Sequence, residues 1–161
     1  MSDDLRARIL AFLAAHTTLS LATRGPDSAP QAAALFYAHD DDLSLYFLSA
    51  PDTRHARALA VDPRVAATIQ DDGQAWQEIQ GLQIEGTAAP VVGAAALARA
   101  AARYAARFDF LAGLLQGGDD GPLTLVGPLA RSRFYVLRPR WLRLIDNRVR
   151  FGYKEELVCS P

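Results

Sequence analysis

The sequence predicts a mainly β fold in which antiparallel strands close into a small barrel with helical insertions. Short runs of apolar and β-branched residues recur along the chain, separated by compact polar turns such as Arg24–Asp27 and His39–Asp42. Short turns between consecutive strands imply antiparallel pairing, and closure of the sheet removes its exposed edges. The chain has 161 residues, the size of one domain, so we expect a single domain over residues 1–161.

The N-terminal half is predicted to begin with a short amphipathic helix. Asp3 and Asp4 lie where they favour the positive end of a helix dipole, and the apolar residues that follow recur at helical spacing. These apolar residues are Leu5, Ile9, Phe12 and Leu13. The elements expected next are strands over 18–23, 29–37 and 43–47, a helix over 52–61, and strands over 65–69 and 79–88. The Asp62–Pro63 step ends the second helix, because a residue before proline disfavours helical backbone angles.

The C-terminal half is predicted to interrupt the barrel before completing it. Residues 93–115 are rich in Ala and Arg, and their large apolar side chains recur at helical spacing, which indicates one long or two short helices. Residues 116–122 have the Gly, Asp and Pro content of a flexible loop. Strands are then expected over 134–136, 141–145 and 149–153.

Composition and charge narrow the classes of partner. Apolar residues make up 50% of the chain and charged residues 22%, and no apolar run approaches the length of a membrane helix, so we expect no membrane association. The formal net charge of −1 gives only weak attraction to polyanions, so nucleic acid is not an expected partner. No secretory signal is visible, and Cys159 has no second cysteine to pair with, so a cytoplasmic location is expected.

The reactive residues give little support to metal or hydrolase chemistry. The three histidines, His16, His39 and His55, show no metal-ligand spacing. No set of Ser, His and Asp residues points to a hydrolase. We therefore expect no bound metal.

The most informative segment is Leu45–His55, where a predicted strand runs into a predicted helix with hydroxyls and a cation at the junction. Free backbone N–H groups at a helix N-terminus, together with the helix dipole, favour an anion. Ser49, Thr53 and Arg54 can add charge-assisted hydrogen bonds, and a planar guanidinium matches phosphate oxygens. The segment therefore has the composition of a phosphate site.

A purely structural interpretation of the same segment stays open. Ser49, followed three residues later by Asp52, forms a pattern like a capping box, in which Arg54 is an ordinary solvated helix residue. Asp52 would also repel a phosphate unless it faces away or is offset by Arg54 and Arg57.

The order of motifs along the chain resembles that of the pyridoxamine 5'-phosphate oxidase-like family. The segment that ends at His55 is similar to the phosphate-binding strand and helix of that family, and the resemblance is good over residues 17–90. Segments similar to the family's first two strands, helix exit and following strand are 21–23, 30–36, 60–65 and 81–88. The run from Ile145 to Leu157 is similar to the ending of a subgroup of uncharacterised split-barrel proteins.

This resemblance implies an antiparallel six-stranded split β-barrel of the FMN-binding type, working as a homodimer with two flavins at the interface. The residues implied to flank the isoalloxazine ring through main-chain groups are Gln31, Ala32, Ala33 and Ala34. Those implied to lie beside the ring and the ribityl chain are Leu48 and Ser49. Those implied to hold the phosphate are Thr53, Arg54 and His55. The expected cofactor contacts are completed by Gln83 and Trp141.

The sequence departs from the family pattern at two places. His55 stands where many relatives have Lys, and a neutral imidazole supplies a hydrogen bond but no permanent charge. The run Ala32–Ala34 replaces bulkier, more polar residues and leaves room near the ring. The basic residues expected to hold the phosphate of pyridoxamine 5'-phosphate are not identifiable, so the small-molecule substrate stays open.

The function implied by the resemblance is an FMN-dependent oxidoreductase. Catalytic side chains are not assigned, because the isoalloxazine itself accepts or releases hydride. In one interpretation Trp141 or Tyr153 and the cation Lys154 reach the flavin across the dimer interface; in the other, Trp141 and Phe151 fill the core. Two alternatives keep the barrel: a carrier or sensor that holds flavin or haem without turnover, and a protein that binds a deazaflavin.

Overall fold

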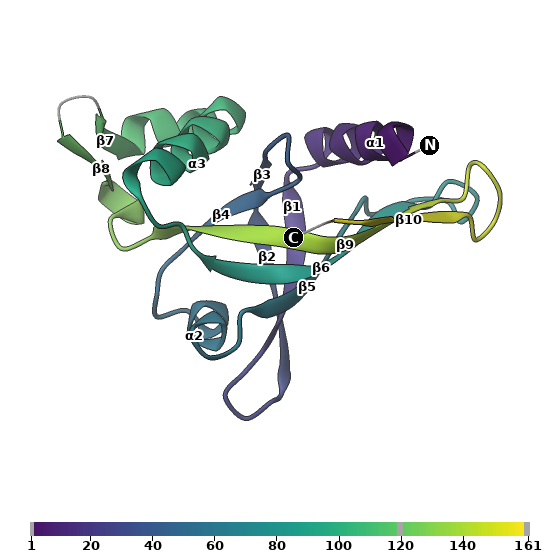
Figure 1. Ribbon diagram of the computed structural model, residues 1–161, viewed down its shortest axis with the longest axis horizontal. Helices are drawn as coiled ribbons and strands as arrows, with labels where there is room; N and C mark the ends of the chain where they lie inside the picture. The colour runs from purple at the N-terminus through teal and green to yellow at the C-terminus, as the bar shows by residue number, and fades with distance from the viewer. Residues whose placement is uncertain (1, 119–120, 160–161) are drawn as a thin grey trace.

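A curled antiparallel sheet forms the centre of the molecule, with helices on both sides of it (Figure 1). The computed structural model describes residues 2–118 and 121–159. In sheet order the strands are β2 (Pro30–Phe36), β1 (Thr18–Arg24), β5 (Arg64–Gln70), β6 (Gln80–Pro90), β9 (Arg133–Asp146), β4 (Leu45–Ser49) and β3 (Ala38–His39), with β10 (Lys154–Val158) also paired to β9. The predicted mainly β split-barrel class is confirmed. The strand number is corrected from six to eight, because β3 and β10 extend the sheet.

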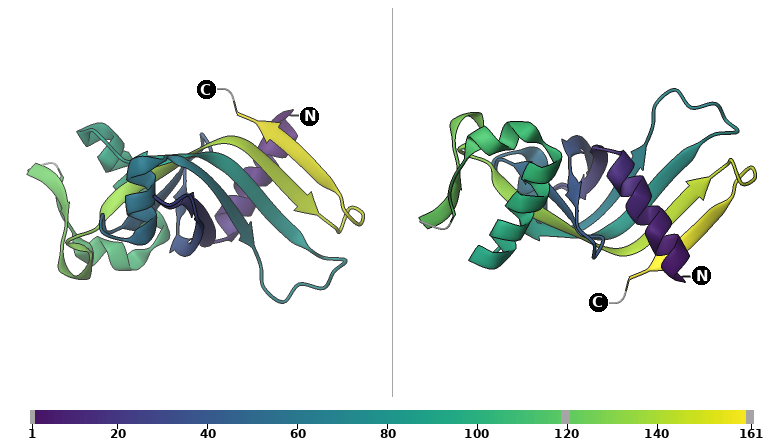
Figure 2. Two further views of the ribbon diagram at one scale, coloured as in Figure 1. Left: turned by 90° about the horizontal axis from the view of Figure 1, so that it is seen from below. Right: turned by 90° about the horizontal axis from the view of Figure 1, so that it is seen from above.

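The helices cover different parts of this sheet. They are α1 (Ser2–Ala15), α2 (Arg54–Val61) and α3 (Ala94–Arg107), followed by the 3-10 helices η1 (Asp109–Leu114) and η2 (Gly127–Leu129). A separate two-stranded sheet consists of β7 (Leu115–Gly118) and β8 (Gly121–Leu125). Seen from above, α1 and α3 lie in front of the main sheet, and seen from below α2 lies in front of it (Figure 2).

Two hydrophobic clusters hold these layers together. The larger one lies inside the curl of the sheet, where Ile9 and Leu13 of α1 pack with Leu21 and Phe47. The smaller one lies on the opposite face of β4 and β9, against α3. The aromatic members of this smaller cluster are Tyr46, Tyr104 and Phe134. Neighbouring residues of β4 therefore point to opposite faces of the sheet, one toward the core inside the curl and the next toward α3.

Strand β9 organises the barrel. One edge of it pairs with β6 over almost its whole length, and the other pairs first with β4 and then with β10. The prediction of two separate strands over 134–136 and 141–145 was wrong, because Pro139 is accommodated at an irregularity in the β6–β9 register, opposite Gly86. A Cβ on Gly86 would lie 2.2 Å from the carbonyl oxygen of Arg138, so this close approach requires glycine.

The strand predicted over 149–153 was also wrong. That segment is a turn, and β10 follows it. Asp146 accepts a hydrogen bond from the backbone of Arg148 at 3.0 Å, and Asn147 Oδ1 accepts one from Gly152 N at 3.0 Å. Gly152 adopts a φ of +73°. These local side-chain bonds favour a turn over the ladder that the alternating apolar residues suggested.

Two further segments differ from the prediction. The loop expected over 116–122 contributes to the β7–β8 pair, with residues 119–120 outside the described part of the chain. Gly117 permits this pairing, because its φ is +87° and a Cβ there would lie 2.2 Å from Pro122 O. The helical region expected over 93–115 forms two helices, α3 and η1. The extended residue Phe108 lies between them, as the C-cap of α3 and the N-cap of η1.

Among residues 2–118 and 121–159, no helix is both long enough and apolar enough to cross a membrane.

Candidate functional site

Strand β4 delivers Ser49 to the start of α2, where three polar side chains meet. The Ser49 hydroxyl is buried at the end of the strand, 2.6 Å from His55 Nε2 and 3.0 Å from the Thr53 hydroxyl. Thr53 in turn donates to the carbonyl of Ala50 at 2.9 Å. These bonds fix the turn between strand and helix, so the first N–H groups of α2 are held beside two hydroxyls.

The helix cap differs from the pattern that Ser49 and Asp52 suggested. Helix α2 begins at Arg54 instead of residue 52, and Thr53 is its N-cap, accepting a hydrogen bond from Ala56 N at 3.3 Å. The capping-box interpretation was therefore wrong in its residues, because Thr53 lies closer to the free N–H groups. Ser49 is left to bond with His55.

Asp52 is neutralised by a residue from a distant segment. Its carboxylate pairs with the Arg131 guanidinium at 2.6 Å, and both side chains are exposed. The repulsion expected between Asp52 and an anion is thus offset by Arg131, a partner other than the two arginines of α2. The positive end of α2 keeps its attraction for a negative group.

A cavity of about 290 Å³ lies between the start of α2 and strand β2. Its lining residues are Pro30, Gln31, Ala32, Ala33, Arg54 and His55. Gln31 Oε1 is buried without a hydrogen-bond partner among the described residues, and so is the hydroxyl of its cross-strand neighbour Thr23. An unpaired buried acceptor is costly, so Gln31 is suited to accept a hydrogen bond from a ligand hydroxyl or N–H group.

His55 and Arg54 contribute different charges to this cavity. Burial lowers the pKa of His55 below its ordinary value of 6.5, because a charged imidazolium is poorly solvated there. At neutral pH the imidazole is therefore uncharged and exchanges a hydrogen bond with Ser49. The permanent positive charge among the lining residues comes from Arg54, which is exposed.

A comparison with known protein families identifies the family of the chain. The family described as pyridoxamine 5'-phosphate oxidase matches residues 5–135. The chain belongs to the pyridoxamine 5'-phosphate oxidase-like family. One relative is the UPF0306 protein plu4501 of Photorhabdus laumondii, which is 25% identical over 143 residues, or 89% of this chain and 88% of the relative.

Two solved structures share the fold. The heme binding protein from Mycobacterium smegmatis superposes with a TM-score of 0.72 at 19% identity, over 95% of this chain and 56% of that one. A candidate pyridoxamine 5'-phosphate oxidase from Listeria innocua gives a TM-score of 0.64 at 22% identity, over 87% of this chain and 97% of that one. These similarities establish a pyridoxamine 5'-phosphate oxidase-like fold. They do not identify the ligand.

Six of the predicted residues are not among those that line the cavity between β2 and α2. Two of them, Ser49 and Thr53, adjoin it through contacts with the lining residue His55, and the other four lie elsewhere. Leu48 packs toward the α3 cluster, on the strand face opposite Ser49. Ala34 follows the lining residues along β2 and is exposed. Gln83 and Trp141 lie on the outer face of the sheet, linked by Arg143, which donates to Gln83 at 3.3 Å and stacks on the Trp141 ring at 4.8 Å. Within one chain, these four do not join the other predicted site residues.

The register of the sheet places Ala32 and Trp141 on one surface. Ala32 pairs with Ala22, Ala22 with Ala66, Ala66 with Glu85, and Glu85 with Trp141. Directly paired residues point to the same face, so Ala32, Ala22 and Ala66 form a row of small side chains that continues through the charged Glu85 to the indole of Trp141. We name the residues of this row the alanine row.

Arg133 was not among the site residues predicted from the sequence. It pairs with Ser49 in the β4–β9 register, so its side chain leaves the sheet on the same face as the Ser49 hydroxyl. Arg133 is exposed. No local motif marks it, because its position depends on pairing between two strands that are far apart in the sequence.

Proposed function

We propose that the protein binds FMN at the corner between β4, α2 and β2 and acts as an FMN-dependent oxidoreductase on a small molecule. The observation that carries the proposal is the meeting of Ser49, Thr53 and Arg54 with the N-terminus of α2, beside a cavity that reaches β2. Hydroxyls, a guanidinium and free N–H groups together suit a phosphate monoester.

The residues around the cavity match the successive parts of FMN, beginning with the phosphate. The phosphate would be held by the first N–H groups of α2, by Ser49 and Thr53, and by Arg54. The unpaired acceptor of Gln31 suits a ribityl hydroxyl, which donates a hydrogen bond. His55 holds Ser49 in place through the 2.6 Å contact.

The ring would extend along β2, outside the cavity. Strand β2 is the last strand at one edge of the main sheet, so one side of its backbone has N–H and C=O groups without a neighbouring strand. Such groups can bond to the polar edge of an isoalloxazine. Bound FMN supplies hydride transfer at its N5 atom, and the chain's part is to bind and orient it and to exclude water.

A second subunit is part of the same proposal. The alanine row is exposed at Ala32 and Ala66 and partly exposed at Ala22. Small apolar side chains on the face of a sheet pack well against a second sheet. A homodimer formed through this row would cover β2 and bring Trp141 of one subunit near the flavin of the other.

A carrier that holds haem or flavin without turnover is the second candidate. The fold shared with the Mycobacterium smegmatis heme binding protein favours it. Haem needs an axial ligand, and the histidine that lines the cavity, His55, already has its Nε2 atom 2.6 Å from Ser49. This favours FMN over haem at this corner.

The test is an FMN titration of three proteins, in which binding is measured by the quenching of flavin fluorescence. Combining Ser49→Ala with Arg54→Ala should raise the dissociation constant by about 10- to 100-fold, because a hydrogen bond to a charged group contributes about 1.5–3 kcal/mol. Arg57→Ala, an exposed arginine of the same helix, is the matched control and should bind like wild type.

Wild-type affinity in the double variant would refute the site. Turnover is read separately, by adding reduced nicotinamide to the FMN-loaded protein. Bleaching of the flavin supports the oxidoreductase, and inertness toward a broad panel of donors supports the carrier.

A further inference from the structure

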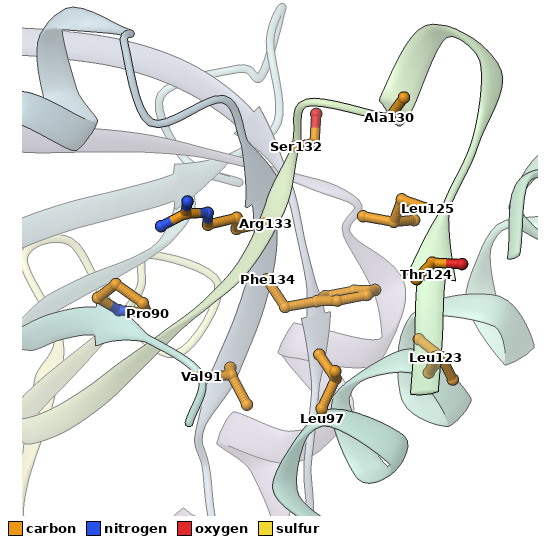
Figure 3. A pocket seen from close by; sticks show the side chains of 10 residues that line it. All are labelled: Pro90, Val91, Leu97, Leu123, Thr124, Leu125, Ala130, Ser132, Arg133 and Phe134. Atoms are coloured by element: carbon orange, nitrogen blue, oxygen red, sulfur yellow. The ribbon is translucent and has the colours of Figure 1, made fainter. Parts of the chain in front are cut away.

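The side chain of Arg133 leaves strand β9 on the same face as the Ser49 hydroxyl. The two residues pair directly in the β4–β9 register, and directly paired residues point to the same face of a sheet. Phe134, the next residue, points to the opposite face and packs in the cluster against α3. Figure 3 shows the Arg133 guanidinium directed away from Phe134 and Leu97, which line the apolar cavity on the α3 side.

The electrostatics of Tyr135 also place the charge of Arg133 on the Ser49 face. Tyr135 lies two residues further along β9, in the core inside the curl, where its ring stacks on Phe47 at 5.3 Å. Burial raises the pKa of the Tyr135 hydroxyl, and the positive charge of Arg133 partly offsets that rise. Residues two apart on a strand share a face, so both observations give Arg133 the same direction.

The start of β9 lies beside the turn between β4 and α2. Strand β4 ends at Ser49 and strand β9 begins at Arg133, so their pair is the last one between the two strands. Two residues before Arg133, the Arg131 guanidinium pairs with Asp52 of the turn at 2.6 Å. Contacts on both sides of Arg133 therefore hold its backbone next to the β4–α2 corner.

The phosphate proposed at this corner carries more charge than Arg54 alone balances. A phosphate monoester has a charge of about −1.5 to −2 at pH 7. Arg131 is already paired with Asp52, and the lowered pKa of His55 keeps its imidazole neutral. Among the residues that the structure describes, Arg133 forms no ion pair, and its side chain is exposed. Such a guanidinium can form paired hydrogen bonds with phosphate oxygens.

We propose that Arg133 binds the phosphate of FMN together with Arg54 and thereby selects FMN over riboflavin. Arg54 comes from α2 and Arg133 from β9, so each would bond to different oxygens of one phosphate. This role rests on the proposed function, because it takes FMN to occupy the β4–α2 corner.

The test compares FMN with riboflavin, which lacks the phosphate, by the quenching of flavin fluorescence at pH 7.5. Wild type should bind FMN more tightly than riboflavin. Arg133→Ala should weaken FMN binding by about tenfold and leave riboflavin binding within about twofold of wild type, because it removes a charge-assisted contact with the phosphate alone. Arg133→Lys should restore part of the loss, since it returns the charge without the planar fork.

Arg138→Ala is the matched control. Arg138 is another exposed arginine of β9, but it pairs with Thr87 of β6 instead of Ser49, so its removal should change neither affinity. An equal ratio of FMN to riboflavin affinity in wild type and Arg133→Ala would overturn the role of Arg133. Equal loss of FMN binding in Arg138→Ala would also overturn it, as would equal weakening of both flavins in Arg133→Ala.

Inorganic phosphate separates this result from the proposed function, because it needs no flavin. Its binding to wild type and to Arg133→Ala is measured by broadening of the phosphorus NMR signal. If wild type binds neither flavin, the proposed function fails, whereas weaker phosphate binding by Arg133→Ala than by wild type supports an anion site at Arg133. Equal broadening with the two proteins would overturn that site. FMN binding that is independent of Arg133 would overturn the role of Arg133 and leave the proposed function intact.

Discussion

At the scale of single residues, Arg54 and His55 stand next to each other but differ in how they can hold an anion. Arg54 brings a guanidinium, whereas burial lowers the pKa of His55 and keeps its imidazole neutral at pH 7. The resemblance placed His55 where many relatives have Lys. This chain therefore has one permanent charge fewer at the proposed phosphate site.

His55→Lys should tighten FMN binding at pH 7.5 several-fold, because it adds a charge beside Ser49 and Thr53. The FMN affinity of wild type relative to that of His55→Gln should rise as the pH falls through the lowered pKa of His55, since protonation of the imidazole adds the same charge. The phosphate group of FMN loses its second proton with a pKa of about 6, which affects every variant alike. The His55→Gln variant measures this contribution without a titrating side chain at position 55. Titrations of the three proteins between pH 5 and 8, by fluorescence, check this. Identical pH profiles for wild type and His55→Gln would contradict the role given to His55.

At the scale of elements, strand β9 depends on one close backbone contact with β6. A Cβ on Gly86 would lie 2.2 Å from Arg138 O, at the irregularity that accommodates Pro139. Gly86→Ala should therefore lower the free energy of unfolding by about 1–3 kcal/mol through overpacking. Gly81→Ala, on the same strand, is the control, because its nearest contact would be an ordinary 3.6 Å. Urea unfolding measures both, and equal losses would show that the close contact is unimportant.

The attachment of α3 depends on one buried carboxylate. Asp40 is fully buried; Arg99 and Arg103 of α3 bind it, and the Tyr46 hydroxyl donates to it at 3.3 Å. Bonds from Arg99 are the main reason that its pKa lies at about 2. Asp40 therefore ties α3 to the hairpin of β3 and β4.

Asp40→Ala should lower the free energy of unfolding at pH 7 by about 2–4 kcal/mol, because it removes these bonds and leaves a buried gap. A folded pKa below the ordinary value of 3.8 means that the stabilisation is present above that pH and lost as the pH falls toward 2. The difference between wild type and variant should therefore narrow at pH 3. Asp4→Ala, which breaks an exposed pair with Arg8, is the control and should cost under about 0.5 kcal/mol. Urea unfolding at both pH values checks this, and a constant difference would contradict it.

The elements show which parts of the fold are readable from local sequence. Strands β1 and β5 were predicted to within one residue at each end, and the presence of helix α1 was predicted from the spacing of its apolar residues. Strand β9 was not, since Pro139 breaks the local pattern and only pairing with Gly86 makes it tolerable. The turn after Asp146 was missed because its side-chain bonds compete with an alternating apolar pattern.

At the scale of the whole molecule, the sequence predicted the corner at Ser49, Thr53, Arg54 and His55 because those residues are neighbours in the chain. The placement of Gln31 beside them came from the resemblance, and the structure brings it to the same cavity. Arg133 and the pairing of Arg131 with Asp52 could not be predicted, since they depend on the long-range register of β4 and β9.

The whole-molecule arrangement also explains why one chain leaves the site open. The alanine row and the free edge of β2 lie on exposed surface, and Trp141 lies at the far end of the row. We expect these features to meet a second copy, which would enclose the ring of the flavin between two sheets. We therefore propose a dimer that holds FMN at the β4–α2 corner of each chain.

Native mass spectrometry of the purified protein, recorded before and after incubation with excess FMN, tests this claim most directly. We expect a dimer that carries one FMN per chain, and loss of the FMN mass in the Ser49→Ala, Arg54→Ala double variant. A monomer without nucleotide after incubation with FMN, or a purified protein that carries haem and takes up no FMN, would contradict it.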